Sequence, residues 1–203
     1  MQQLAEPPRR IVTERLLLRP YEARDAGLLK EAIDSSLEHL RTFMDWAWAA
    51  PEPEAVIRRR LRDFRRLFDR GDDWIYGIFT VDGSELVGGG GLHRRVGVEA
   101  LEIGYWIRAS RVRQGIATEA AGALTRVAFE RCGVIRTEIH VDPANAPSLG
   151  VAERLGYVRE AVLRQRLPPV RPGTGRRDEV VSSLLEEEYP GSPAAAVWVE
   201  GLV

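Results

Sequence analysis

The sequence predicts a single α/β domain built on one mixed sheet, and three observations support this class. Short runs rich in apolar, aromatic and β-branched residues alternate with longer runs whose apolar residues recur every three or four positions. The first half contains strands joined by tight turns, whereas the second half places a helix between strands, as in a β–α–β crossover. The chain has 203 residues, enough for one substantial core.

The expected elements follow in order along the chain. Helices are predicted over residues 25–40, over 53–70 with Gly71 as the terminating glycine, over 115–131 with Gly133 in the same role, and from Pro147 to Gly156. Residues 41–50 are expected to form a loop or short helix, and residues 164–177 a flexible loop or hairpin tip. The expected strands cover residues 11–19, 74–81, 86–92, 101–107, 134–141, 157–163 and 178–185.

A run of four glycines, residues 88–91, interrupts the third expected strand. Glycines within a strand indicate either a bulge beside the core or a place where a ligand approaches the backbone closely. Both interpretations remain open from the sequence.

Composition excludes several classes of function. Acidic and basic residues nearly cancel, at 30 and 29, so nothing attracts the whole chain to nucleic acid or to an anionic membrane. Cys132 is the single cysteine, which rules out an internal disulfide. No apolar run approaches the roughly 18 residues of a membrane span, and residues 1–10 lack a signal-peptide core. We therefore expect a cytoplasmic protein without nucleic-acid or membrane partners. The three histidines are isolated, which predicts no metal site.

The most informative stretch is residues 111–121, where an expected strand leads through a basic, glycine-containing turn into a helix. The free N–H groups of such a turn and the helix dipole both favour a bound anion. The pattern predicts a phosphate-bearing ligand. A dinucleotide-binding fold would place its glycine motif after the first strand with different spacing, so that alternative is disfavoured.

Five ordered segments match one family pattern: residues 13–19, 102–107, 115–120, 145–148 and 154–157, with 177–178 near the last strand also fitting. Together they resemble the RimJ/RimL-like branch of the Gcn5-related N-acetyltransferases (GNAT). The resemblance covers residues 11–189 as one domain and leaves 1–10 and 190–203 as terminal extensions. One departure is Val112 and Arg113, which replace the residues usual at the start of the turn.

The resemblance implies a mostly antiparallel sheet of about seven strands, splayed between the fourth and fifth, and flanked by about four helices. It implies acetyl-CoA as donor and a primary amine as acceptor, either a protein N-terminus or a small molecule. The acyl group would pass directly to the amine in a ternary complex. A homodimer is possible. The acceptor's identity and the use of a longer acyl donor stay open.

The resemblance also assigns cofactor-binding residues. The pyrophosphate would lie on the main chain of the turn, the pantetheine arm in the gap between the splayed strands, and the thioester oxygen against a strand N–H, with Ile107 favoured. The implied set is Tyr105, Trp106, Ile107, Arg113, Gln114, Gly115, Ile116, Ala117, Thr118, Asn145 and Ser148.

Glu102 is the predicted general base, because the acceptor amine must lose a proton before it attacks. A carboxylate on an otherwise apolar strand costs free energy unless it pairs with a cation or is hydrated. A role in proton transfer through one water would explain why a glutamate stands at this position. The alternative is a plain salt bridge to an arginine. Glu138 and His140, on the neighbouring strand, are the other candidate bases.

Ser148 is the predicted acid for the leaving thiolate, because Ala152 stands where many relatives carry a tyrosine. The alternative is that Ser148 only caps the helix that starts at Pro147. Asn145 has the same two interpretations, a pantetheine contact or a turn residue.

The acceptor side is predicted to involve Phe43, Asp45, Trp46 and Glu102. Two other classes of function remain: an acyl-CoA-binding regulator with little catalytic activity, and a nucleotide-binding module unrelated to acyl transfer.

Overall fold

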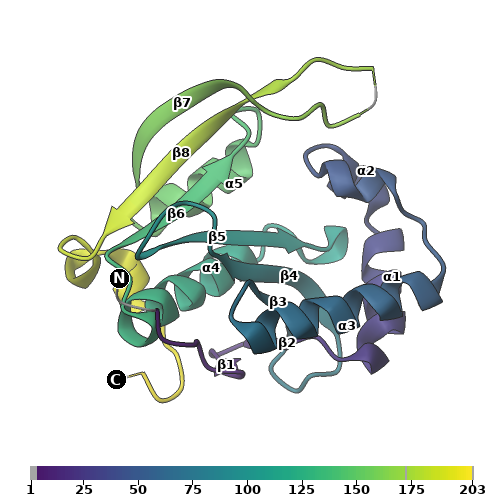
Figure 1. Ribbon diagram of the computed structural model, residues 1–203, viewed down its shortest axis with the longest axis horizontal. Helices are drawn as coiled ribbons and strands as arrows, with labels where there is room; N and C mark the ends of the chain where they lie inside the picture. The colour runs from purple at the N-terminus through teal and green to yellow at the C-terminus, as the bar shows by residue number, and fades with distance from the viewer. Residues whose placement is uncertain (1–3, 172, 203) are drawn as a thin grey trace.

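The computed structural model describes residues 4–171 and 173–202 and shows one eight-stranded sheet (Figure 1). Its strands are β1 (Ile11–Val12), β2 (Leu16–Pro20), β3 (Trp74–Thr80), β4 (Leu86–His93), β5 (Ala100–Ile107), β6 (Arg136–Val141), β7 (Val158–Leu167) and β8 (Arg177–Leu185). The spatial order is β1-β2-β3-β4-β5-β6-β8-β7. Among the strands of the described residues, only β5 and β6 pair in parallel, and the helix between these strands makes the predicted crossover.

The α-helices that accompany the sheet are α1 (Ala26–Asp34), α2 (Leu37–Arg41), α3 (Glu54–Arg70), α4 (Ile116–Val127) and α5 (Ala146–Arg154). The single helix expected over residues 25–40 is divided at Ser35 and Ser36. The Ser36 hydroxyl accepts a hydrogen bond from the Ala109 N–H at 2.9 Å, which ties the break to the end of β5. Gly71 and Gly133 end their helices in the left-handed conformation, as predicted.

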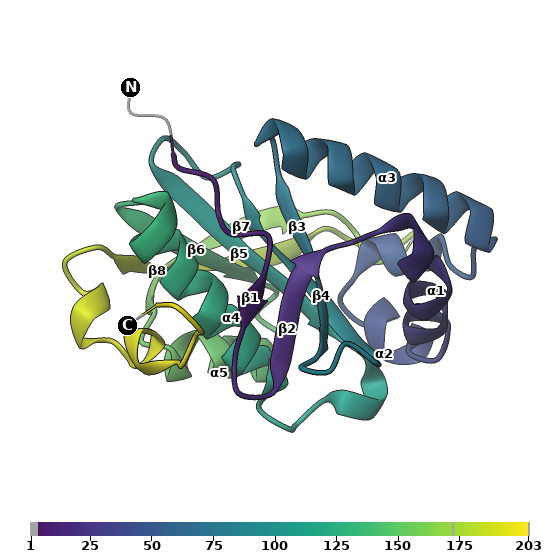
Figure 2. The same cartoon turned by 90° about the horizontal axis from the view of Figure 1, so that it is seen from below.

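Two apolar clusters lie on opposite faces of the sheet. Neighbouring residues of one strand belong to different clusters, since strand side chains alternate between faces. Thus Ile78 and Val87 pack with α4, whereas Phe79 and Leu86 pack with α1 and α3. Figure 2 shows α4 and α3 separated by the strands.

The sheet opens between β5 and β6. These strands pair only from Ala100 opposite Arg136 to Glu102 opposite Glu138. On its other side, β5 stays paired with β4 as far as Ile107. The edge of β5 beyond Glu102 is therefore free, and the predicted splay between the fourth and fifth expected strands is confirmed.

The glycine run of β4 accommodates close packing by the protein itself. A Cβ on Gly88 would lie 2.2 Å from the Trp106 carbonyl oxygen, and one on Gly89 would lie 2.5 Å from the indole nitrogen of the same residue. The pairing with β3 also shifts register between Ile78 and Phe79. The bulge beside the core is therefore present in this strand. Gly89 and Gly90 also line a cavity, so the close approach of a ligand stays a prediction.

One expected strand needs correction. The first expected strand, residues 11–19, is a short hairpin, because the Thr13 N–H bonds the Leu16 carbonyl at 2.9 Å and reverses the chain. The strand count is therefore eight rather than about seven. The expected terminal extension covers residues 190–203, of which residue 203 lies outside the described residues. Its described part, residues 190–202, packs onto α4, with Ala194 and Val199 buried. Within the described residues, no helix is long and apolar enough to cross a membrane.

Candidate active site

Two cavities meet beside the free edge of β5. The first, of about 1000 Å³, extends along the turn before α4 and the start of α5. The second, of about 830 Å³, lies under the β7–β8 hairpin and reaches Glu102. Each has the size of a small-molecule site. The residues that line both are Phe43, Met44, Tyr105, Trp106, Asn145 and Ser148.

The turn before α4 presents a row of free N–H groups to the first cavity. Within the described part of the chain, the backbone N–H groups of residues 113–118 have no hydrogen-bond acceptor. Arg113 and Gly115 both adopt the left-handed conformation, with φ of 61° and 78°. The turn opens a helix of 12 residues, so its dipole adds to the N–H groups. This geometry fits the pyrophosphate expected from the sequence.

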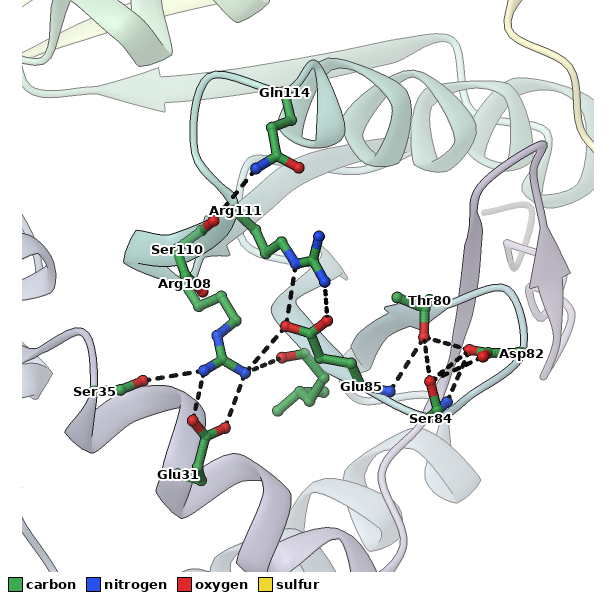
Figure 3. A network of polar contacts seen from close by, with 11 residues as sticks. Glu31, Ser35, Thr80, Asp82, Ser84, Glu85, Arg108, Ser110, Arg111 and Gln114 are labelled. Carbon is green, nitrogen blue, oxygen red and sulfur yellow. Dashed lines mark hydrogen bonds and ion pairs between the residues drawn. The ribbon is translucent and has the colours of Figure 1, made fainter.

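A polar network anchors the segment that leads into the turn (Figure 3). Arg108 is buried and donates to Glu31 on α1 at 2.9 Å, and it lies 3.3 Å from Glu85. Arg111 pairs with Glu85 as well, and this hydrogen-bonded arginine lowers the pKa of the Glu85 carboxyl. Arg111 therefore holds the turn in place through protein contacts.

The other side chains of the turn are mostly engaged with protein groups. The Gln114 amide donates to the Ser110 carbonyl at 3.3 Å, and Gln114, unlike its neighbours Arg113 and Gly115, does not line the first cavity. Arg15 donates to the Gln114 carbonyl at 2.9 Å. Arg154, from α5, reaches Thr118 at 3.4 Å and lines the first cavity.

Asn145 and Ser148 lie at the start of α5, where the cavities meet. The Asn145 side chain accepts from the Ser148 N–H at 3.3 Å, so the capping interpretation of Asn145 holds. Asn145 also lines both cavities, so its contact with pantetheine stays a prediction. The Ser148 hydroxyl lies 2.8 Å from the Tyr105 hydroxyl, and burial raises the pKa of Tyr105 to about 12. This tyrosine therefore stays protonated at neutral pH.

Glu102 lies at the end of the paired part of β5 and is 7% exposed. Arg95 binds both carboxylate oxygens, at 2.7 and 2.5 Å, so the expected alternative of an arginine salt bridge is present. Burial acts to raise the pKa of Glu102, but the hydrogen bonds and charge of Arg95 outweigh it and lower the pKa overall. Glu102 is therefore an ionised, weakly basic carboxylate that faces the second cavity.

The other candidate bases stand next to Glu102. His140 is bonded to Glu138 at 2.6 Å through one ring nitrogen, and its second ring nitrogen lies 3.4 Å from Glu179. His140 and Glu179 line the second cavity, whereas Glu138 does not. Within the described residues, no group of three or more potential ligands is arranged to hold a metal ion.

The expected acceptor-side residues line the second cavity, with Trp46 packed edge-on against Trp106 at 5.9 Å between ring centroids. Sequence reasoning missed Leu167, Pro168 and Arg177, which close the cavity from the β7–β8 hairpin. Residues 164–177 were expected to form a flexible loop or a hairpin tip, and the structure has a hairpin here, with β7 extending to Leu167. The only available signal was the family match at residues 177–178.

Arg177 connects the hairpin to the elements across the cavity. It pairs with Asp142 at 2.7 Å, and it donates to the Phe43 carbonyl at 3.4 Å. Figure 1 shows the hairpin extending toward α2.

A splayed sheet, an anion-binding turn and two joined cavities define a transferase that binds a phosphate-bearing donor beside an acceptor. Residues 15–158 match the family model for the acetyltransferase (GNAT) domain, and the chain belongs to this family.

Individual relatives agree with that assignment. The putative ribosomal N-acetyltransferase YdaF of Bacillus subtilis is 32% identical over 184 residues, which cover 89% of this chain and 96% of the relative. Among solved structures, Mycobacterium smegmatis RimJ in complex with CoA-disulfide is 25% identical with a TM-score of 0.79, covering 96% of this chain and 95% of that one. A putative ribosomal-protein-serine acetyltransferase from Vibrio cholerae is 28% identical with a TM-score of 0.73, covering 89% and 99%.

These findings confirm the RimJ/RimL-like resemblance, the GNAT fold and an N-acetyltransferase that uses acetyl-CoA. The roles of the individual site residues stay predictions.

Proposed function

We propose that this N-acetyltransferase acts on the α-amino group of a polypeptide N-terminus. The main observation behind this proposal is that the two cavities meet at Tyr105 and Ser148. The donor in the first cavity and an amine in the second would meet there, so transfer needs no acyl-enzyme. Holding both reactants in one place supplies much of the acceleration.

Glu102 receives the proton of the amine, through a bridging water. It faces the second cavity, and its ion pair with Arg95 keeps it ionised. The same ion pair makes it a weak base, which suits an acceptor that holds its proton loosely. A polypeptide α-amine has a pKa of about 7.7–8.0, whereas a lysine amine has one near 10.4. The site therefore favours α-amines, in agreement with relatives named for ribosomal proteins.

Ser148 protonates the leaving thiolate, and Tyr105 positions it. If the Tyr105 hydroxyl donates to the Ser148 oxygen, the serine proton is directed away from the tyrosine and is free to point into the junction. In the complete step the amine nitrogen forms a bond to the acetyl carbon and the carbon–sulfur bond breaks. One proton passes from nitrogen to Glu102 through water, and one passes from Ser148 to sulfur and returns from solvent.

The base assignment is tested by measuring CoA release with a peptide acceptor across a pH series. Glu102→Gln should lower kcat/KM by about 6- to 11-fold at pH 7, because without the base only the neutral fraction of an α-amine with a pKa of about 7.7–8.0 can react. The loss should shrink above about pH 8, where an α-amine is already neutral. Glu160→Gln is the matched control, since Glu160 is also paired with an arginine but lies outside both cavities.

A full rate for Glu102→Gln at neutral pH, together with a large loss for His140→Asn, would transfer the base role to His140. A peptide with a blocked α-amine and a free lysine side chain tests the acceptor class. Acetylation of that lysine at an equal rate would contradict the α-amine preference.

The acid assignment predicts a different dependence on pH. A thiol has a pKa of about 8.5, so the leaving thiolate needs little help above that pH. Ser148→Ala should reduce the rate most below pH 8.5, and Tyr105→Phe should show the same trend with a smaller loss. Acetyl-CoA binding without CoA release for any amine of a broad panel would instead favour the regulatory alternative.

A further inference from the structure

A third hollow, of about 440 Å³, lies between the turn before α4 and the C-terminal residues. It shares Gly115, Thr118 and Arg154 with the first cavity, so the two are continuous around the turn. Its outer wall is formed by residues 196–198, which lie beyond the segment matched by the family model. The full lining is Glu14, Gly115, Thr118, Glu119, Arg154, Ala196, Val197 and Trp198.

Trp198 stands half exposed on this wall, although the residues around it are firmly held. Trp198 is 50% exposed, whereas the next residue, Val199, is 2% exposed. Arg126, on α4, donates to the carbonyls of Val197 and Leu202 at 2.9 and 3.1 Å. The Trp198 side chain is therefore presented at the hollow by an anchored backbone.

The contact between the tail and α4 is close and specific. A Cβ on Gly122 would lie 2.6 Å from a methyl group of Val197, so only glycine allows this approach. The Glu200 N–H bonds the Val12 carbonyl at 2.9 Å, which joins the tail to β1 as well. Figure 2 shows the C-terminal segment lying against α4.

The charges around the hollow favour a nucleobase over a second phosphate. Glu119 is neutralised by Arg15, whose Nε bonds it at 2.6 Å. Glu14 adds a carboxylate and Arg154 a guanidinium. A planar, uncharged base could stack on the Trp198 ring, with the Arg154 guanidinium beside it. The Glu14 carboxylate could accept a hydrogen bond from an exocyclic amine of the base.

We propose that this hollow receives the adenine base of CoA, which stacks on Trp198. The inference rests on acetyl-CoA being the donor. In that molecule the thioester and the adenosine lie on opposite sides of the pyrophosphate. With the thioester at the Ser148 junction and the pyrophosphate on the turn, the nucleoside lies beyond the turn, where the third hollow begins.

The test compares two donors on the full chain by titration calorimetry: acetyl-CoA, and acetyl-4′-phosphopantetheine. The second donor lacks the adenosine together with its 3′-phosphate and one phosphate of the pyrophosphate. Stacking of a base on an aromatic side chain contributes about 1–3 kcal/mol. Trp198→Ala should therefore raise the Kd for acetyl-CoA by about 5- to 100-fold, and leave the Kd for the truncated donor unchanged. Trp198→Phe should retain most of the affinity for acetyl-CoA.

Trp48→Ala is the matched control, because Trp48 is similarly exposed at 39% and lines none of the three cavities. It should alter neither Kd. An unchanged Kd for acetyl-CoA in Trp198→Ala, or an equal loss for both donors, would overturn the inference. Failure of the unsubstituted chain to bind acetyl-CoA would overturn the donor assignment, and this inference with it.

Discussion

Replacing Gly115 by alanine tests the conformation of the turn that carries the cofactor site. Gly115 has a φ of 78°, where a residue with a Cβ costs about 1–2 kcal/mol. The new Cβ would lie 3.3 Å from the end of the Arg15 side chain, and this flexible group can move away. Backbone strain, rather than steric overlap, therefore sets the magnitude.

This strain must appear in one of two measurements. If the alanine variant keeps the left-handed turn without ligand, its free energy of unfolding falls by about 1–2 kcal/mol, and the melting temperature falls by about 2–8 °C. If the turn relaxes instead, acetyl-CoA must restore it, and the Kd rises by roughly 5- to 30-fold. In both cases the loss of unfolding free energy and the loss of acetyl-CoA binding free energy should add up to about 1–2 kcal/mol.

The assay combines urea unfolding with titration by acetyl-CoA for wild type and Gly115→Ala. Gly133→Ala is a suitable control, because Gly133 is left-handed with φ of 70° but ends a helix away from the cavities. It should lose stability only, with an unchanged Kd. If Gly115→Ala changed neither stability nor Kd, the left-handed turn would not be what presents the N–H groups.

Three further predictions concern buried groups. Tyr157→Phe should lower the free energy of unfolding by about 1–3 kcal/mol in urea, because the lost hydroxyl bonds Thr125 at 2.7 Å and Thr137 at 2.9 Å; an unchanged midpoint would contradict this. Burial raises the pKa of Cys132 to about 12, so a thiol reagent at pH 8 should label the chain only after denaturation, and rapid native labelling would refute it. The pKa of Glu102 is lowered in the folded protein. The ionised Glu102 carboxylate therefore stabilises the fold above its pKa in the unfolded chain, about 4.3, and this stabilisation is lost as pH falls through its pKa in the folded protein. Glu102→Gln should accordingly flatten the acid limb of unfolding free energy against pH, and parallel curves would count against the assignment.

The sequence by itself determined the class of fold, most of its elements and the family. Periodicity located the strands and helices because side chains repeat every two residues in a strand and every 3.6 in a helix. Gly71 and Gly133 marked helix ends because glycine adopts the left-handed conformation after a helix without the steric penalty that a Cβ brings. The turn of residues 113–118 was recognisable because its function lies in the main chain, and a strand, a glycine and a helix start are local features.

Only the tertiary structure decided which side chains meet. Glu102 could have remained a free base or paired with any of many arginines, and the β4–β5 hairpin brought Arg95 to it. Likewise Tyr105 and Ser148 are far apart in the chain and meet because α5 starts beside the open edge of β5.

The docking of the C-terminal residues also had no local signature. Trp198 and its neighbours show no clear periodicity, and their anchors, Arg126 and Gly122, lie on a distant helix. Such contacts depend on the three-dimensional path of the chain, since a buried hydrogen bond needs a partner whose position no sequence pattern specifies.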